Sequence, residues 1–112
     1  MTLEDFNNIV DSYGLYKRNG YISLSGFFEK DTCGDAPVVT FYVKVKKLEI
    51  YLDLDNNTGN MKGGYIGGLI LKRPHVMVSE VTTANYILNE LFKKRKKILV
   101  DNKLKEINSD FT

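Results

Sequence analysis

The sequence predicts an α+β fold: an N-terminal helix, an antiparallel sheet of three to five strands, and a C-terminal helix or helix pair packed on one face. Two observations carry this prediction. Apolar residues recur at helical spacing near both ends of the chain, and they alternate with polar residues in its middle. The turns between the strands are too short for parallel crossovers. With 112 residues, 43% of them hydrophobic, residues 1–112 are expected to form a single domain.

The N-terminal helix is predicted over residues 3–13. Thr2 and Asp5 have the spacing of a capping box, which satisfies two backbone N–H groups at a helix start. Apolar side chains follow at helical spacing as far as Tyr13. Gly14 then supplies the left-handed residue that commonly ends a helix.

A hairpin is predicted next, because Asn19-Gly20 is typical of a two-residue turn. Such a turn would pair residues 15–18 with residues 21–24. The alternation of apolar and small polar residues over 21–30 indicates a half-buried strand.

Residues 38–54 alternate strongly, but the apolar positions change from odd to even numbers at Lys46-Lys47. A shift of one residue moves every side chain to the other face of a strand, so we expect a bulge or a tight reversal there. A further strand is predicted over residues 65–72, closed or placed at an edge by Pro74.

The C-terminal helix is predicted to open at Ser79. Residues 93–97 are five consecutive basic residues, which point all round a helix and leave no face to bury. The helix must therefore project beyond the domain or end there, and a break near residues 97–101 is favoured because the apolar stripe changes sides. The first stripe consists of Val81, Ala84, Leu88, Leu91 and Phe92, and the second of Val100, Leu104, Ile107 and Phe111.

The net charge of +2 is unevenly distributed along the chain. Residues 93–105 carry seven basic residues against Asp101 alone, a net charge of +6. One interpretation is a surface that binds nucleic-acid phosphates without sequence preference. The other interpretation is a solvated helix end. The excess of lysine over arginine argues against sequence-specific recognition of base edges. The residues that would contact phosphates are Lys93, Lys94, Arg95, Lys96, Lys97, Lys103 and Lys105.

Motifs for catalysis and for metal or cofactor binding are weak. Cys33 and His75 are the only residues of their types, and nothing in the sequence completes a catalytic group around them. Asp53 begins a pattern similar to a calcium loop, but Thr58 stands where glycine is needed and Gly64 where a closing glutamate is needed. We therefore expect no cofactor, no metal and no enzymatic activity.

The sheet face opposite the helices is predicted to be the interaction surface. Tyr42 and Tyr51 fall opposite the apolar side chains of their own strands. Tyrosine is common at interfaces because it combines a rigid ring with a polar tip. Tyr42, Tyr51 and Asp53 are the residues predicted to bind a partner.

The leading functional hypothesis is a small non-enzymatic protein that binds a protein or nucleoprotein partner through that sheet face or through residues 93–105. Its size and its composition, which is typical of AT-rich genomes, suit an accessory protein of a phage or mobile element that inhibits a host or defence factor. A nucleic-acid-binding module using residues 93–105 is the alternative.

Location and assembly can also be predicted. No apolar run approaches the ~20 residues that span a bilayer, and the N-terminus lacks the order of a signal peptide, so a cytoplasmic protein with no membrane partner is expected. Residues 98–100, or the second apolar stripe of the C-terminal helix, would lie exposed without a partner, which suits a homodimer.

Overall fold

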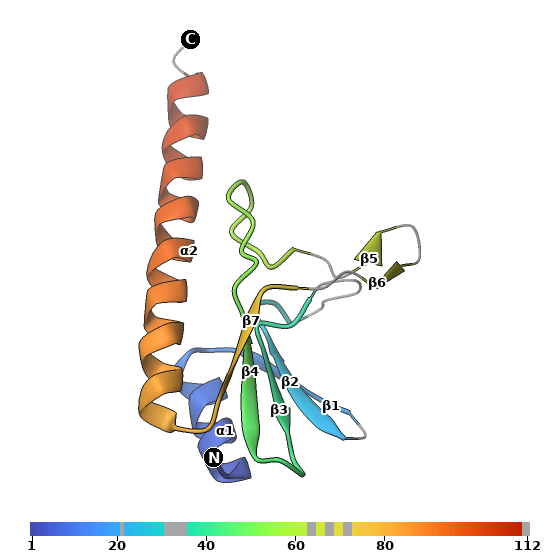
Figure 1. Cartoon of the computed structure of the whole chain (residues 1–112). Helices are drawn as coiled ribbons and strands as arrows, with labels where there is room; N and C mark the ends of the chain where they lie inside the picture. The colour runs from blue at the N-terminus through green and yellow to red at the C-terminus, as the bar shows by residue number, and fades with distance from the viewer. Residues whose placement is uncertain (21, 31–35, 63–64, 67–68, 71–72, 111–112) are drawn as a thin grey trace.

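The predicted α+β fold is confirmed in a computed structural model, which describes residues 1–20, 22–30, 36–62, 65–66, 69–70 and 73–110 (Figure 1). Five antiparallel strands form one sheet in the order β1-β2-β3-β4-β7, and β5 pairs only with β6. The elements are α1 (Leu3–Ser12), β1 (Tyr16–Asn19), β2 (Ser23–Phe27), β3 (Val39–Tyr42), β4 (Lys47–Tyr51), β5 (Tyr65–Ile66), β6 (Leu69–Ile70), β7 (His75–Val78) and α2 (Val81–Asp110).

The caps of α1 are those that the sequence predicts. The Thr2 hydroxyl accepts a hydrogen bond from the Asp5 N–H at 3.1 Å, and the Asp5 carboxylate accepts one from the Thr2 N–H at 2.9 Å. These bonds favour the ionised carboxyl and hold the pKa of Asp5 below its ordinary value. After the helix ends, Gly14 adopts a left-handed conformation with φ of 62°.

The first hairpin forms, but the predicted two-residue turn at Asn19-Gly20 is wrong. That turn would place Arg18 opposite residue 21, whereas Arg18 pairs with Ser25. The Gly20 N–H donates to the Ser23 carbonyl at 2.8 Å, so the chain reverses beyond Gly20 instead of at Asn19-Gly20.

The change of phase within residues 38–54 is a tight reversal between β3 and β4. Lys46 has φ of 57°, and its N–H donates to the Tyr42 carbonyl at 2.9 Å. Val43 and Val45 lie in this turn and are 47% and 59% exposed, so the reversal begins before Lys46-Lys47. The reversal places the apolar side chains of β3 and β4 on one face of the sheet.

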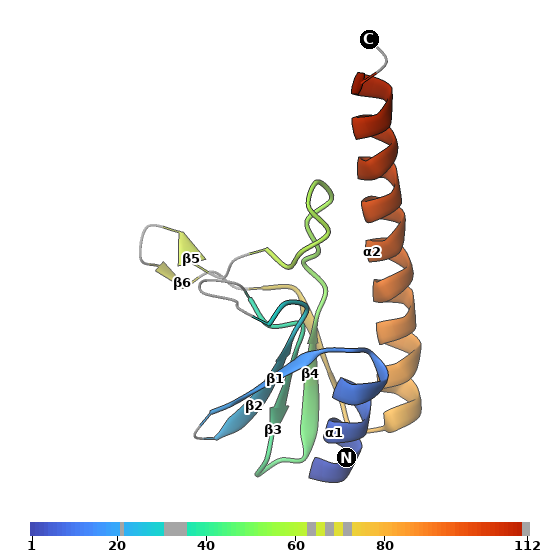
Figure 2. The ribbon, with the colours of Figure 1, turned by 180° about the vertical axis from the view of Figure 1, so that it is seen from behind.

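The core lies between this face and the two helices, which Figure 2 shows on the same side of the sheet. Phe41 and Leu48 pair across β3 and β4 and are almost completely buried. Phe6 of α1 stacks on Phe41 with ring centroids 5.4 Å apart, and Leu88 of α2 is fully buried in the same cluster. Helix α1 and helix α2 are therefore held by one continuous core.

The segment after β4 differs from its prediction. The strand predicted over residues 65–72 is wrong, because β5 and β6 are two short strands that pair antiparallel with each other. Strand β7, which was not predicted, follows Pro74 directly and pairs with β4 at the edge of the sheet. Pro74 thus precedes a strand instead of closing one, and α2 begins at Val81, two residues after the predicted start.

Helix α2 is continuous over 30 residues, so the break predicted near residues 97–101 is wrong. The loop at residues 54–61 runs beside the helix beyond the end of the sheet and keeps one side covered (Figures 1 and 2). Ile98 is only 9% exposed, and the Asn102 side chain donates to the Asn57 carbonyl. Only after these contacts does the helix extend alone.

Replacing Gly59 tests the packing of this loop. Gly59 has φ of 77°, and an added Cβ would lie 3.2 Å from Leu99, so Gly59→Ala is expected to lower the free energy of unfolding by about 2 kcal/mol. Gly14 has φ of 62° with no atom within 4 Å of an added Cβ, so Gly14→Ala should cost about 1 kcal/mol. Urea unfolding of both variants measures the difference, and equal losses would show that Leu99 accommodates the methyl group.

Candidate functional site

Two surfaces carry side chains that could bind a ligand or a partner. One is the outer face of the sheet, which points away from the helices, and the other is the side of α2 that the body does not cover. On the outer face, Ser25, Thr40, Glu49 and Met77 occupy neighbouring positions across β2, β3, β4 and β7. The Ser25 and Thr40 hydroxyl oxygens lie 3.2 Å apart and share a hydrogen bond. This face is therefore polar at its centre.

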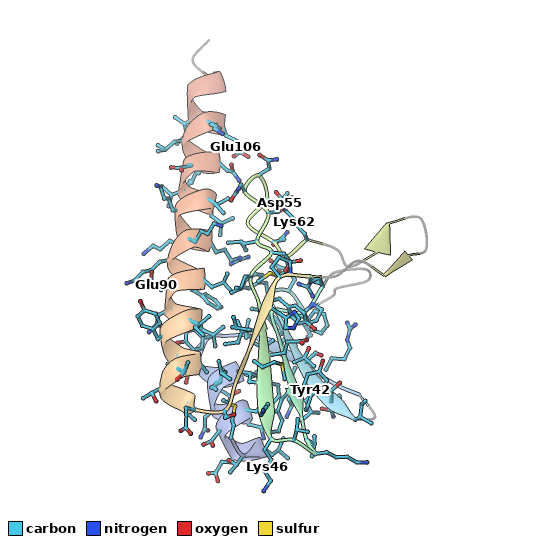
Figure 3. All side chains as sticks on the ribbon, in the orientation of Figure 1. Tyr42, Lys46, Asp55, Lys62, Glu90 and Glu106 are labelled. Carbon is cyan, nitrogen blue, oxygen red and sulfur yellow. The ribbon has the colours of Figure 1, made fainter. Side chains whose placement is uncertain are left out.

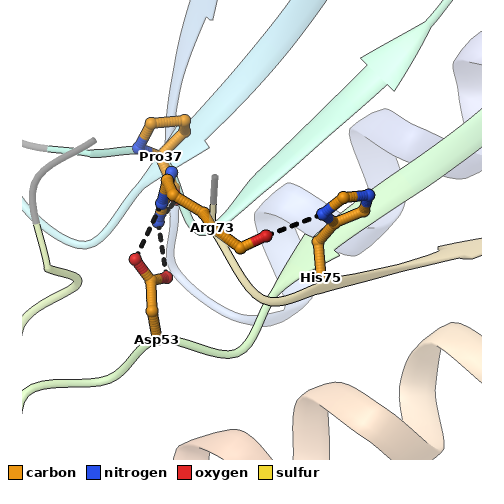
Figure 4. A network of polar contacts seen from close by, with 4 residues as sticks. All are labelled: Pro37, Asp53, Arg73 and His75. Atoms are coloured by element: carbon orange, nitrogen blue, oxygen red, sulfur yellow. Dashed lines mark hydrogen bonds and ion pairs between the residues drawn. The ribbon is translucent and has the colours of Figure 1, made fainter. Parts of the chain in front are cut away.

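Glu49 is the centre of a polar network on the outer face. Its side chain is 12% exposed, and its carboxylate accepts a hydrogen bond from the Tyr42 hydroxyl at 3.2 Å. The other carboxylate oxygen lies 3.5 Å from Nε2 of His75. Nδ1 of His75 lies 2.8 Å from the Arg73 carbonyl, which can only accept, so Nδ1 carries the proton (Figure 4).

Both tyrosines that were predicted to bind a partner belong to this network. Burial raises the pKa of Tyr51, and the neighbouring Glu49 carboxylate raises it further. The same two causes raise the pKa of Tyr42. Tyr42 and Tyr51 therefore keep their hydroxyl protons to a higher pH than an exposed tyrosine does.

Asp53, the third residue predicted to bind a partner, is paired within the chain. Arg73 donates to its two carboxylate oxygens, each at 2.8 Å, and also donates to the Pro37 carbonyl at 3.0 Å (Figure 4). The same guanidinium lies 3.8 Å above the ring centre of Tyr51. Since the side chains of Asp53 and Arg73 are only 7% and 10% exposed, this ion pair fastens the end of β4 to the segments before β3 and β7.

The pattern similar to a calcium loop forms an ordinary turn. Asp55 accepts hydrogen bonds from the N–H groups of Asn57 and Thr58 at 2.7 and 3.1 Å, and these bonds lower the pKa of its carboxyl. Within the described parts of the chain, no cluster of three or more histidine, cysteine or acidic side chains is suited to a metal ion. Cys33 and Gly64 lie outside the described residues.

The basic run on α2 does not point entirely into solvent, contrary to the expectation that it leaves no face to bury. The Arg95 guanidinium lies 4.1 Å above the ring centre of Phe28 and donates to the Gly59 carbonyl at 2.9 Å. Its side chain is only 20% exposed and lies 3.7 Å from Glu29. Arg95 thus holds the body against α2, whereas six lysines of the segment are exposed: Lys93, Lys94, Lys96, Lys97, Lys103 and Lys105.

An open groove of about 640 Å³ runs along α2, and we name it the α2 groove. Leu99 and Val100 are 41% and 49% exposed, and Leu104 and Ile107, at 53% and 43%, continue the apolar surface towards the end of the helix. The side chains that define the groove are Phe92, Lys93, Lys96, Leu99, Val100 and Lys103. The groove therefore combines an apolar floor with ammonium groups.

The sequence indicated some of these residues and missed others. Tyr42, Tyr51 and Asp53 do come together, while Arg73 and His75 join them through β7, which the sequence analysis did not assign. The strict alternation in β4 was the signal that placed Glu49 on the outer face.

No match was found in comparisons of the chain with protein-family models, curated proteins and solved structures. Among the described residues, no helix has both the length and the apolar character needed to cross a membrane.

The Asp53 and Arg73 pair is expected to be strongly coupled. Asp53→Asn should lower the free energy of unfolding by about 3 kcal/mol, because it leaves a buried guanidinium without its counterion. The double variant Asp53→Asn/Arg73→Met removes both charges and should be more stable than the single variant. Chemical denaturation of Asp53→Asn, Arg73→Met and the double variant gives the coupling, and strictly additive losses would contradict it.

Alkaline titration tests the network around Glu49. Because folding raises the pKa of Tyr42 and Tyr51 above the ordinary 10.0, the folded chain retains protons that the unfolded chain releases. Stability should therefore be unaffected by these groups below pH 10.0 and should fall as the pH rises above it. Tyrosinate absorbance should show a late component that shrinks in Tyr51→Phe, and an unchanged titration curve would contradict the assignment.

Proposed function

We propose that this chain is a small non-enzymatic interaction protein that binds a macromolecular partner through the α2 groove. The observation that carries the proposal is the exposure of Leu99, Val100, Leu104 and Ile107 along a helix that extends past the body. Neighbouring exposed apolar side chains on a protein surface are typical of interaction sites. The polar rim of lysines keeps such a surface soluble when no partner is bound.

The outer face of the sheet serves this function as a rigid support. Its central side chains are tied to one another, since Glu49 binds Tyr42 and Asp53 binds Arg73. A partner that used these polar groups would first have to break buried hydrogen bonds. The exposed groups on α2 present no such cost, which favours α2 as the binding surface. An accessory role in a phage or mobile element, inhibiting a host or defence factor, agrees with this kind of surface and with the composition.

Nucleic-acid binding is the second candidate, and the exposure of six lysines on residues 93–105 favours it. It predicts binding that weakens steeply with salt. The apolar floor of the α2 groove distinguishes the two candidates, because phosphates make no use of Leu99 and Val100.

Crosslinking tests the proposal directly. A photoreactive amino acid at Val100 should give discrete protein adducts in the cells that express the chain, and the same group at Lys44, in the exposed β3–β4 turn, should not. Adducts to nucleic acid alone would favour the second candidate, and no adducts at Val100 would contradict the proposal.

The salt dependence of binding to duplex DNA and single-stranded RNA supplies an independent measurement. If the partner is a protein, the affinity for both nucleic acids should stay the same when four lysines are neutralised in Lys93→Gln/Lys96→Gln/Lys97→Gln/Lys103→Gln. The matched control neutralises four exposed lysines elsewhere: Lys30, Lys44, Lys47 and Lys62. Tight, salt-sensitive binding that only the first variant loses would support nucleic acid.

A further inference from the structure

We infer that the partner of the α2 groove is an acidic amphipathic helix belonging to another protein. This inference rests on the proposed function and names the class of its partner. Three features of the groove carry it: the line of its apolar side chains, the sign of its charge and its length.

Apolar side chains follow one side of α2 along the groove. Phe92, at the body end, is half-buried, with its ring packed on two aromatic rings of the body. Leu99 and Val100 follow Phe92 by seven and eight residues, about two turns further along the same side. Leu104 and Ile107 extend this line by two further turns. A second helix can pack its own ridge of apolar residues beside such a line.

The charge of the groove selects an acidic partner. Every ionisable side chain that lines the groove is basic: Lys93, Arg95, Lys96 and Lys103. Lys93 lies 3.5 Å from Glu90, but both side chains are largely exposed and the pair is correspondingly weak. No carboxylate among the described side chains lies within ion-pair distance of Lys96 or Lys103. Glutamates or aspartates on a partner would meet these ammonium groups at the rim.

The apolar side of α2 fits a helix of moderate size. From Asn89, where the groove begins, to Ile107, in the apolar surface beyond the last lining residue Lys103, the helix axis rises about 27 Å. A partner helix of about 18 residues, five turns, would cover this distance. The loop at residues 54–61 borders the groove on one side, where Arg95 donates to the Gly59 carbonyl and Gly59 lies beside Leu99. Val100, on the other side of the groove, is 49% exposed.

The same features disfavour two other occupants. A second copy of α2 would bring lysines against lysines along the rim, which is repulsive. A nucleic acid would leave Leu99 and Val100 uncovered, and Arg95, the arginine of the basic run, is already bound to Gly59. An acidic helix satisfies both the apolar floor and the lysines.

A peptide titration tests the inference. The probe is a fluorescent 18-residue peptide, with a length of about five turns, that carries leucines at helical spacing and glutamates beside them. It should bind the intact protein saturably and at least about 10-fold more tightly than a peptide of the same composition with the leucines scrambled. Polyglutamate and a DNA duplex serve as purely anionic probes.

Variants locate the site. Leu99→Ser/Val100→Ser should weaken binding of the patterned peptide about 10-fold or more, and Lys96→Gln/Lys103→Gln about 5-fold. Lys44→Gln/Lys47→Gln removes the same charge in and beside the β3–β4 turn, and should bind as the parent does. Figure 3 shows Lys46 of this turn at the opposite end of the molecule from Glu106. Circular dichroism and urea unfolding establish that each variant is folded.

Each outcome decides the inference. Equal binding of the patterned and scrambled peptides, or equal loss in the Lys44 and Lys47 control, would overturn it, as would failure of the patterned peptide to bind. Preference for the DNA duplex would replace it with nucleic-acid binding. Protein adducts at Val100 without peptide binding would overturn the acidic-helix partner and leave the proposed function standing.

Discussion

The reversal of the chain between β3 and β4 is the constraint on which the rest of the fold depends. The apolar side chains of β3 stand at odd positions and end at Phe41, whereas those of β4 stand at even positions and begin at Leu48. The reversal brings both onto one buried surface. Phe6 and Leu88 pack on that surface, so both helices owe their positions to it. The opposite side of the same strands is thereby free to hold the Tyr42 and Glu49 network.

Local chemistry explains which elements the sequence predicts. A capping box acts within one turn, and strict alternation acts within one strand, so α1 and the β3–β4 pair follow from their own residues. The first hairpin has another register than its Asn19-Gly20 dipeptide predicts, because Arg18 pairs with Ser25. Strand β7 is short and follows a proline, and its pairing with β4 is what makes it a strand.

The candidate surfaces also depend partly on local sequence and partly on contacts between distant segments. The alternation pattern places Tyr42 and Tyr51 correctly on the outer face, but their partners come from segments distant in sequence. The sequence around Asp53 indicates an exposed acidic residue, because its partner Arg73 lies 20 residues further along the chain. Arg95 resembles its lysine neighbours in the sequence and differs from them because Phe28 and Gly59 lie within its reach.

The continuity of α2 fixes the angular phase of everything along it. Each residue of an α-helix turns by about 100°, so Leu88 in the core and Leu99 in the α2 groove are related by a single rotation with no joint between them. Inserting one residue between them would rotate the groove by about 100° around the helix axis, although all its side chains would be unchanged. Among insertions between Leu88 and Leu99, those close to a whole number of turns keep the groove facing the same way.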